Sequence, residues 1–349
     1  MFELEKLVRD NIRELLPYSS ARDEFAGIEG VFLDANESPF GKLNRYPDPY
    51  QSTLKEVLAD QKGIDPAQIF VGNGSDEVID LLFRIFCNPG LDKALTFAPT
   101  YGMYDVSSAI NDVELIKVDL TESFGLDLQQ TKVVLDREPI KLTFVCSPNN
   151  PTGNAFPRKD IEQILQCSSR IVVVDEAYID FSESNSMIEL IQSYPNLVVT
   201  QTMSKARGLA AARVGFAFAN PEIIRLLNNV KPPYNVSGLN QKAAIESLRE
   251  VELFESNVKL ILSQRKELEK NLMKLNTVIK VYPSEANFLL VEFNDADFMY
   301  KALVERKVIV RNRSNVVENC IRITVGSPIE NNQLINEIKL IENEKSTVY

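Results

Sequence analysis

The chain of 349 residues is 44% hydrophobic and 25% charged, and its formal net charge is −11. This composition is typical of a soluble globular protein, and the length favours about two domains. An acidic chain lacks the basic surface that binds a nucleic acid or an anionic membrane, so we expect neither as a partner. Histidine is absent, which excludes Ser-His-Asp and Cys-His hydrolases and metal sites with histidine ligands.

The targeting and cysteine signals predict a cytoplasmic protein. The N-terminal residues Met1 to Lys6 are charged and lack the apolar core of a signal peptide. No window approaches the roughly 18 consecutive apolar residues of a membrane span. The cysteines show no paired spacing, and three lie in apolar surroundings where reduced, buried thiols are expected. They are Cys87, Cys146, Cys167 and Cys320.

In chain order, the sequence predicts a helix over 3–15, an irregular segment and a short extended run at 31–34. From about residue 53 to 220, short β-rich runs alternate with helical patterns. Several runs are apolar throughout, which is typical of strands covered by helices on both faces. This pattern predicts an α/β fold with one wound sheet of mostly parallel strands. The predicted strands are 69–72, 94–97, 115–118, 142–146, 171–174, 197–200 and 214–219.

A second, smaller α+β unit is predicted after the helix-stopping segment Lys231 to Asn235. A long helical region over 241–275 carries a core-facing apolar stripe. We therefore expect a large domain at 31–240, a small domain at 241–349 and an N-terminal arm at 1–30 that packs with the small domain. The extended runs and helices of the small unit are 278–282, 288–293, 308–310 and 320–325, and 297–305 and 329–342.

Polar residues follow three neighbouring predicted strands. Asn150 follows 142–146, Asp175 and Tyr178 follow 171–174, and Lys205 follows 197–200. Parallel strands end at one edge of a sheet, where ligands bind. Pyridoxal 5′-phosphate requires a lysine that bonds to its aldehyde and an acid at its pyridine nitrogen. The set therefore predicts a pyridoxal 5′-phosphate site.

Each of these residues also has a simpler structural interpretation. Asp175 could cap the turn after its strand, although an isolated carboxylate at the end of an apolar strand is costly to bury and a pyridinium would be its partner. Tyr178 and Asn150 could hold the ring oxygen, or could be a packing tyrosine and a turn asparagine. Lys205 could be a surface lysine at the start of a helix, where the helix dipole disfavours a cation.

A glycine-rich turn, Gly72 to Ser75, leads from a predicted strand into a helix and could bind the cofactor phosphate through backbone N–H groups. It lacks the Lys-Ser/Thr of a P-loop and fits the dinucleotide-binding pattern poorly. Arg213 could add a guanidinium, or could only neutralise acids. The candidate phosphate ligands are Ser75, Asp76, Ser204 and Arg213.

Three further residues are candidates for contact with the ring or the substrate. Tyr101 follows the strand 94–97 and could stack on the ring, or could belong to the core. Arg322 lies within the apolar run 320–325, and Arg311 follows 308–310. An arginine in an apolar strand needs either an edge position or a buried anion, such as a substrate carboxylate or phosphate.

The ordered set resembles the fold type I pyridoxal phosphate-dependent aminotransferases over nearly the whole chain. Among these aminotransferases, several shorter motifs resemble the histidinol-phosphate aminotransferase family. The resemblance implies an obligate homodimer with shared active sites, because in that family Tyr46 reaches the phosphate from the other subunit. The sequence departs from the family at Arg207 and Ala211. The motifs lie at 11–13, 17–18, 33–37, 45–47, 100–104 and 320–326.

The resemblance also implies a role for each matching residue. Lys205 would bond to the cofactor, Asp175 would pair with its ring nitrogen, Tyr178 and Asn150 would hold its ring oxygen, and Tyr101 would stack on it. The phosphate ligands would be Ser75, Asp76, Ser204 and Arg213. The substrate-binding residues would be Tyr18, Asn36, Arg311 and Arg322.

The implied reaction is a transamination between glutamate and imidazole acetol phosphate in histidine biosynthesis. Two related activities use nearly the same cofactor residues: an aromatic amino-acid aminotransferase and a phosphate-recognising amino-acid decarboxylase. A non-catalytic protein that binds the cofactor is a more remote alternative.

Overall fold

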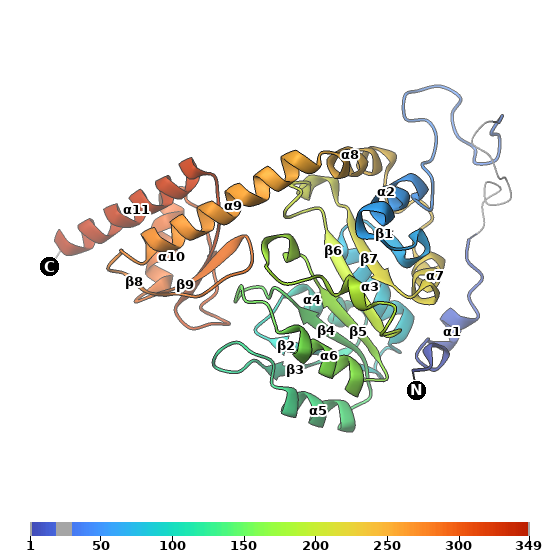
Figure 1. Ribbon diagram of the computed structural model, residues 1–349, viewed down its shortest axis with the longest axis horizontal. Coiled ribbons are helices and arrows are strands. Elements are labelled where there is room, and N and C mark those ends of the chain that lie inside the picture. The colour runs from blue at the N-terminus through green and yellow to red at the C-terminus, as the bar shows by residue number, and fades with distance from the viewer. Residues whose placement is uncertain (1, 19–29, 348–349) are drawn as a thin grey trace.

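The computed structural model describes residues 2–18 and 30–347. Its larger sheet has the strand order β1-β7-β6-β5-β4-β2-β3 (Figure 1). β7 is antiparallel to both neighbours, whereas the other pairings in this sheet are parallel. The strands predicted between residues 69 and 219 are confirmed. Their bounds are β1 (Ile69–Gly72), β2 (Lys93–Ala98), β3 (Glu114–Asp119), β4 (Ile140–Cys146), β5 (Ile171–Asp175), β6 (Leu197–Thr202) and β7 (Gly215–Ala219).

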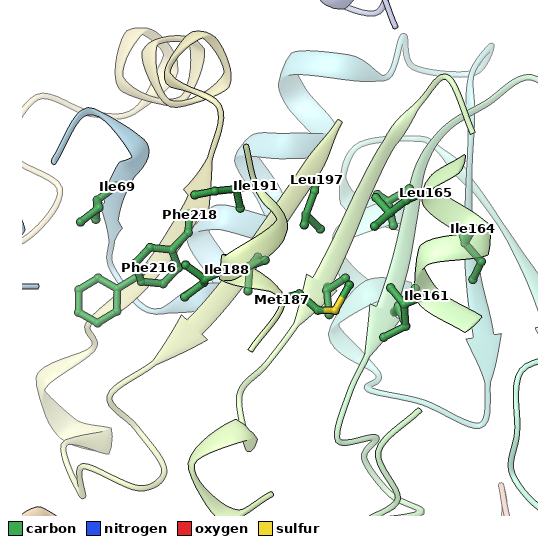
Figure 2. Close-up of a cluster of buried hydrophobic side chains, with 14 of the residues drawn as sticks. Ile69, Ile161, Ile164, Leu165, Met187, Ile188, Ile191, Leu197, Phe216 and Phe218 are labelled. Carbon is green, nitrogen blue, oxygen red and sulfur yellow. The ribbon is translucent and has the colours of Figure 1, made fainter. Parts of the chain in front are cut away.

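Helices cover both faces of this sheet. Successive side chains of a strand point to opposite faces, so Val172 and Val174 of β5 enter one core cluster whereas Ile171 and Val173 enter the other. Figure 2 shows part of the first cluster, where Ile161 of α6 lies on the same side of the sheet as Phe218 of β7. The first face carries α2 (Ser52–Lys62), α5 (Leu128–Arg137), α6 (Arg158–Cys167) and α8 (Gly238–Arg249). The second carries α3 (Ser75–Phe86), α4 (Met103–Ile110) and α7 (Pro221–Val230).

A smaller antiparallel sheet, ordered β10-β11-β9-β8, lies at the other end of the molecule (Figure 1). The predicted strand at 308–310 is wrong, because pairing begins only at Arg311. No helix among residues 2–18 and 30–347 is long and apolar enough to cross a membrane. The strands are β8 (Val278–Val281), β9 (Phe288–Phe293), β10 (Arg311–Asn312) and β11 (Cys320–Thr324). The helices are α9 (Val251–Leu272), α10 (Ala296–Glu305) and α11 (Pro328–Thr347).

The helical region predicted over 241–275 consists of two helices, α8 and α9, which meet at Glu250. α8 is bound to the larger unit, because the Gln61 side-chain amide donates to the Leu248 carbonyl at 2.7 Å. We propose that the two domains divide near Glu250 and not at the predicted 240/241, which falls inside α8.

The first residues of the predicted N-terminal arm, 2–13, lie against the larger unit, whereas the sequence predicts packing with the smaller one. Residue 1 and residues 19–29 of the arm lie outside the described residues. Leu4 and Val8 are buried in the core cluster that α3 lines, and the backbone N–H of Arg9 donates to the Ile85 carbonyl at 3.0 Å. The apolar side chains of Leu4 and Val8 are thus buried in the core that α3 lines. The predicted single helix is replaced by a 3-10 turn (Leu4–Lys6) and α1 (Asp10–Arg13).

The turn between β1 and α3 passes very close to β7. A Cβ on Gly215 would overlap the backbone nitrogen of Ser75 and the carbonyl carbon of Gly74. Gly74 has a φ of 81°, in the left-handed region that glycine tolerates. These two glycines therefore fix the position of the first turn of α3 against the sheet.

We predict that Gly215→Ala lowers the free energy of unfolding by about 1 to 3 kcal/mol, because the added methyl group meets backbone and not a flexible side chain. Gly102→Ala is the matched control, since a Cβ there has no heavy atom within 4 Å. Thermal melting of both variants measures the difference. Equal melting temperatures would show that the β1–α3 turn can shift to accommodate the methyl group without a loss of stability.

Candidate active site

A cavity of about 480 Å³ lies at the carboxyl edge of the larger sheet and reaches the smaller unit. Because every strand of the larger sheet except β7 runs in one direction, the segments after β1, β2, β4, β5 and β6 meet at this edge. The lining residues are Ser75, Asp76, Tyr101, Cys146, Asn150, Asp175, Ala177, Tyr178, Thr202, Ser204, Lys205, Arg213, Arg311, Arg313 and Arg322.

Asp175 is a buried carboxylate at the end of β5. Strand alternation directs it to the face of α4, where the Tyr104 hydroxyl donates to Oδ2 at 2.8 Å. The Thr200 hydroxyl donates to Oδ1 at 3.1 Å. Burial raises the pKa of Asp175, while the hydrogen bonds from Tyr104, Thr200 and the Ala177 backbone lower it. The carboxylate is therefore positioned by neutral donors, and no ion pair to it is found among the described residues.

A chain of polar contacts runs from the smaller unit to Tyr178. Arg322 donates from Nη1 to the Asn150 side-chain oxygen at 2.6 Å, and Asn150 donates from its amide nitrogen to the Tyr178 hydroxyl at 3.3 Å. The Tyr178 ring meets the edge of Phe288 at 5.2 Å. Asn150 therefore orients both a phenol and a guanidinium toward the cavity, which a simple turn asparagine or packing tyrosine would not do.

Lys205 lies in a turn after β6, and no helix begins there. Lys205 therefore does not begin a helix, and no helix dipole acts on its charge there. Its Nζ lies 5.6 Å from the centre of the Tyr178 ring. Lys205 is exposed to solvent, yet its pKa is lowered, mainly by partial burial and by the charge of Arg322. Arg213 lowers the pKa as well, whereas the charges of Asp175 and Asp76 raise it. A lowered pKa increases the fraction of neutral amine, the form that attacks an aldehyde.

The candidate phosphate ligands come together at the start of α3. Arg213 donates to the Ser204 hydroxyl at 3.3 Å and lies 3.5 Å from the Asp76 carboxylate. Tyr101 donates to the other oxygen of Asp76 at 3.0 Å. The N–H groups in the first turn of α3 are the ones that a helix leaves free for an anion, so Ser75 lies at an anion-binding position.

Three predicted substrate or phosphate residues do not reach this cavity within one chain. Tyr46 is half exposed and stacks on Tyr234, with ring centres 4.3 Å apart. Asn36 lies beside it along a separate hollow of about 490 Å³. Tyr18 is 70% exposed and lies near Tyr50. All three therefore lie on the surface, outside the cavity of their own chain.

Several site residues were not predicted from the sequence. Tyr104 and Thr200 bind Asp175, yet Tyr104 reads as one apolar position of a helix and Thr200 as one residue of an apolar strand. Arg313 shares the cavity with Arg311 and Arg322. It lies just after β10, which ends at Asn312, so no strand pattern in the sequence indicates it.

Arg207, where the sequence departs from the family, has well-defined partners. Its guanidinium lies 3.6 Å from the centre of the Phe254 ring in α9. It also donates to the Ser247 carbonyl in α8 at 2.7 Å. Arg207 therefore joins the Lys205 turn to the two helices that connect the units. Ala211 lies in an exposed 3-10 turn, and nothing in the structure explains its identity.

The cavity fits pyridoxal 5′-phosphate on the chemistry of its residues. Asp175 is a buried acid without a cation partner among the described residues, which a protonated ring nitrogen would provide. Lys205 is an amine with a lowered pKa, and Ser75, Ser204 and Arg213 offer N–H, hydroxyl and guanidinium groups for a phosphate.

The fold and this set of residues define a pyridoxal phosphate-dependent aminotransferase of fold type I. The profile of the family "Aminotransferase class I and II" matches residues 25–338, and the chain belongs to this family. Within it, its relatives are histidinol-phosphate aminotransferases. The enzyme of Parabacteroides distasonis is 52% identical over 97% of this chain and 99% of its own length. That of Cytophaga hutchinsonii is 49% identical over 97% of this chain and 99% of its own length.

Solved structures share the fold. The histidinol-phosphate aminotransferase of Clostridium acetobutylicum has a TM-score of 0.80 at 23% identity, covering 86% of this chain and 92% of that one. The Sinorhizobium meliloti enzyme, in complex with pyridoxal-5′-phosphate, has a TM-score of 0.78 at 24% identity over 88% and 90%. The L-threonine-O-3-phosphate decarboxylase of Porphyromonas gingivalis also matches, with a TM-score of 0.73 at 23% identity over 86% and 91%. The fold alone therefore does not separate transamination from decarboxylation.

We predict that Tyr104→Phe lowers the free energy of unfolding of the cofactor-free protein by about 1.5 to 3 kcal/mol, because it removes a hydrogen bond to a buried carboxylate. Tyr194→Phe is the control, since its hydroxyl accepts only from the exposed Gln166 side chain among the described residues. Urea denaturation measures both. Equal losses would mean that Tyr104 acts by packing alone.

Proposed function

We propose that this enzyme transfers an amino group between L-glutamate and imidazole acetol phosphate, forming 2-oxoglutarate and L-histidinol phosphate in histidine biosynthesis. The observation that supports the proposal is the pair of arginines, Arg311 and Arg322, that lines the cavity. Arg311 and Arg322 are directly opposite each other in the β10–β11 ladder, in a protein whose net charge is −11. Since β11 lies between β10 and β9, Arg322 is not at an edge and needs an anionic ligand.

Different residues of the cavity have different roles in the reaction. Pyridoxal 5′-phosphate, when bound, withdraws electrons from the α-carbon of an attached amino acid and so acidifies its proton. We assign Asp175 to hold a proton on the ring nitrogen, and Lys205 to take the proton from the substrate α-carbon and return it later. Arg322 orients the anionic group of the substrate, and Asn150 fixes Arg322. Tyr101 bounds the ring on the α4 side.

We also propose that the active form is a homodimer in which Tyr46, Tyr18 and Asn36 complete the cavity of the partner subunit. The segment that carries Asn36 and Tyr46 extends away from the body of the protein (Figure 1). It exposes large apolar side chains, which is unusual for a segment that faces only water. They are Val31, Leu33, Phe40 and Leu43, each at least 73% exposed.

A cytoplasmic location completes the proposal. All four cysteines are free thiols, and Cys87, Cys146 and Cys320 are buried. Reduced thiols agree with a reducing compartment, where disulfides are rare. The substrates are small metabolites, and we propose no nucleic-acid or membrane partner.

Lys205→Ala should abolish the formation of 2-oxoglutarate from glutamate and imidazole acetol phosphate, because no other cavity residue supplies an amine. Lys280→Ala, which removes an exposed lysine of β8, is the control and should retain full activity. A coupled assay of 2-oxoglutarate measures both. Retained turnover in Lys205→Ala would contradict the assignment, and release of carbon dioxide from a phosphorylated amino acid by the wild type would favour the decarboxylase.

The dimer proposal predicts that two inactive chains can rescue each other. A mixture of Lys205→Ala and Tyr46→Ala chains, unfolded and refolded together, forms hybrid dimers with one site that has both Lys205 and Tyr46. We therefore expect activity above the sum of the two separately refolded variants. No gain from mixing, with hybrid dimers present by mass spectrometry, would show that Tyr46 acts within its own chain or not at all.

A further inference from the structure

Three arginines in or next to the hairpin of β10 and β11 lie close together. Arg311 of β10 is opposite Arg322 of β11, and Arg313 follows directly after β10, which ends at Asn312. Asn312, between them, faces away and donates to the Asp297 carboxylate at 2.6 Å. All three arginines line the cavity. The hairpin is therefore built to present three guanidinium groups together.

The backbone of Arg313 is fixed, whereas its guanidinium has no hydrogen-bond or ion-pair partner in the part of the chain that the structure describes. Its N–H donates to the Cys320 carbonyl at 2.8 Å, and its carbonyl accepts from the N–H groups of Val316 and Val317 at 2.8 and 2.9 Å. Its Nε is buried and makes no hydrogen bond to any residue in the described ranges. A buried, unpaired donor is costly, so this side chain is held ready for a ligand.

Among residues 2–18 and 30–347, no carboxylate forms an ion pair with these three arginines. Burial lowers the pKa of Arg313, the neighbouring charges of Arg322 and Arg311 lower it further, and Tyr178 alone acts in the opposite direction. Burial also lowers the pKa of Arg322, as does the charge of Arg311, whereas Tyr178 and Tyr101 raise it. Like charges opposite each other in a ladder are destabilising. An anion with more than one negative charge would relieve this repulsion better than a carboxylate.

We infer that Arg313 determines specificity, by favouring a phosphate monoester dianion over a carboxylate at the outer end of the cavity. The inference rests on the proposed function. In glutamate, the α-carboxylate carbon is bonded directly to the amine-bearing carbon. In histidinol phosphate, a CH2–O link separates that carbon from phosphorus, so the phosphate extends further outward. Arg322 is held by Asn150, and its charge acts on the Lys205 amine, so it suits the nearer group. Arg313 adds the charge and the donors that a dianion with three oxygens needs.

The test measures the two half-reactions of the holoenzyme separately, by the change in cofactor absorbance in single turnovers. Arg313→Gln should weaken the apparent affinity for L-histidinol phosphate on the order of 10- to 100-fold, the worth of a charged hydrogen bond. The affinity for L-glutamate should change less than about threefold, within the spread of an ordinary surface substitution. Arg313→Lys, which keeps the charge and loses the planar fork, should fall between wild type and Arg313→Gln. The control is Arg249→Gln, which removes an exposed arginine of α8 outside the cavity.

A pH series supplies a second readout. Wild-type affinity for L-histidinol phosphate should fall as pH drops through about 6, where a phosphate monoester loses its second charge, and this dependence should flatten in Arg313→Gln. Equal weakening of both substrates, or of neither, would overturn the inference. A wild type that does not use L-histidinol phosphate would instead overturn the proposed function. Competitive inhibition of the glutamate half-reaction by inorganic phosphate then tests Arg313 alone, with a raised inhibition constant in Arg313→Gln expected and an unchanged one contradicting it.

Discussion

The hydrogen bonds that hold the Asp175 carboxylate are the interaction on which the rest of the site depends. A carboxylate at the end of an apolar strand would be expelled or neutralised without them, and Tyr104 and Thr200 provide the donors from α4 and β6. Neutral donors keep the charge oriented without cancelling it. The Asp175 carboxylate is thus available to pair with a protonated ring nitrogen. Tyr104 and Thr200 are needed because they hold it in place for that pairing.

The cavity is rich in cationic side chains although the chain as a whole is acidic. The protein carries a net charge of −11, yet its cavity gathers Lys205, Arg213 and three further arginines around only two acids, Asp76 and Asp175. Burial lowers the pKa of Lys205, and the charges of Arg322 and Arg213 lower it further by repelling its ammonium form, against the opposing effect of Asp175 and Asp76. One cluster of cations therefore serves two purposes: it attracts anionic substrates, and it keeps the amine reactive.

The sequence was sufficient for the larger sheet and for most of the site, because apolar runs of strand length and the polar residues that follow them are local signals. It could not reveal contacts made across the fold. Tyr104 meets Asp175 only because α4 packs on that face of the sheet, and the arm containing Leu4 was assigned to the other unit because its partner, α3, is distant in sequence. The sequence leaves open that a helix starts at Lys205, because the contacts of Arg207 in this turn are made with α8 and α9, which are distant in sequence.

The central claim is that Asp175 keeps a proton on the ring nitrogen of the cofactor. The most direct measurement is the ¹⁵N chemical shift of pyridoxal 5′-phosphate labelled at that nitrogen, in the wild-type holoenzyme and in Asp175→Asn. The account predicts a protonated nitrogen at neutral pH in the wild type and an unprotonated one in the variant. The same protonation state in both proteins would contradict it.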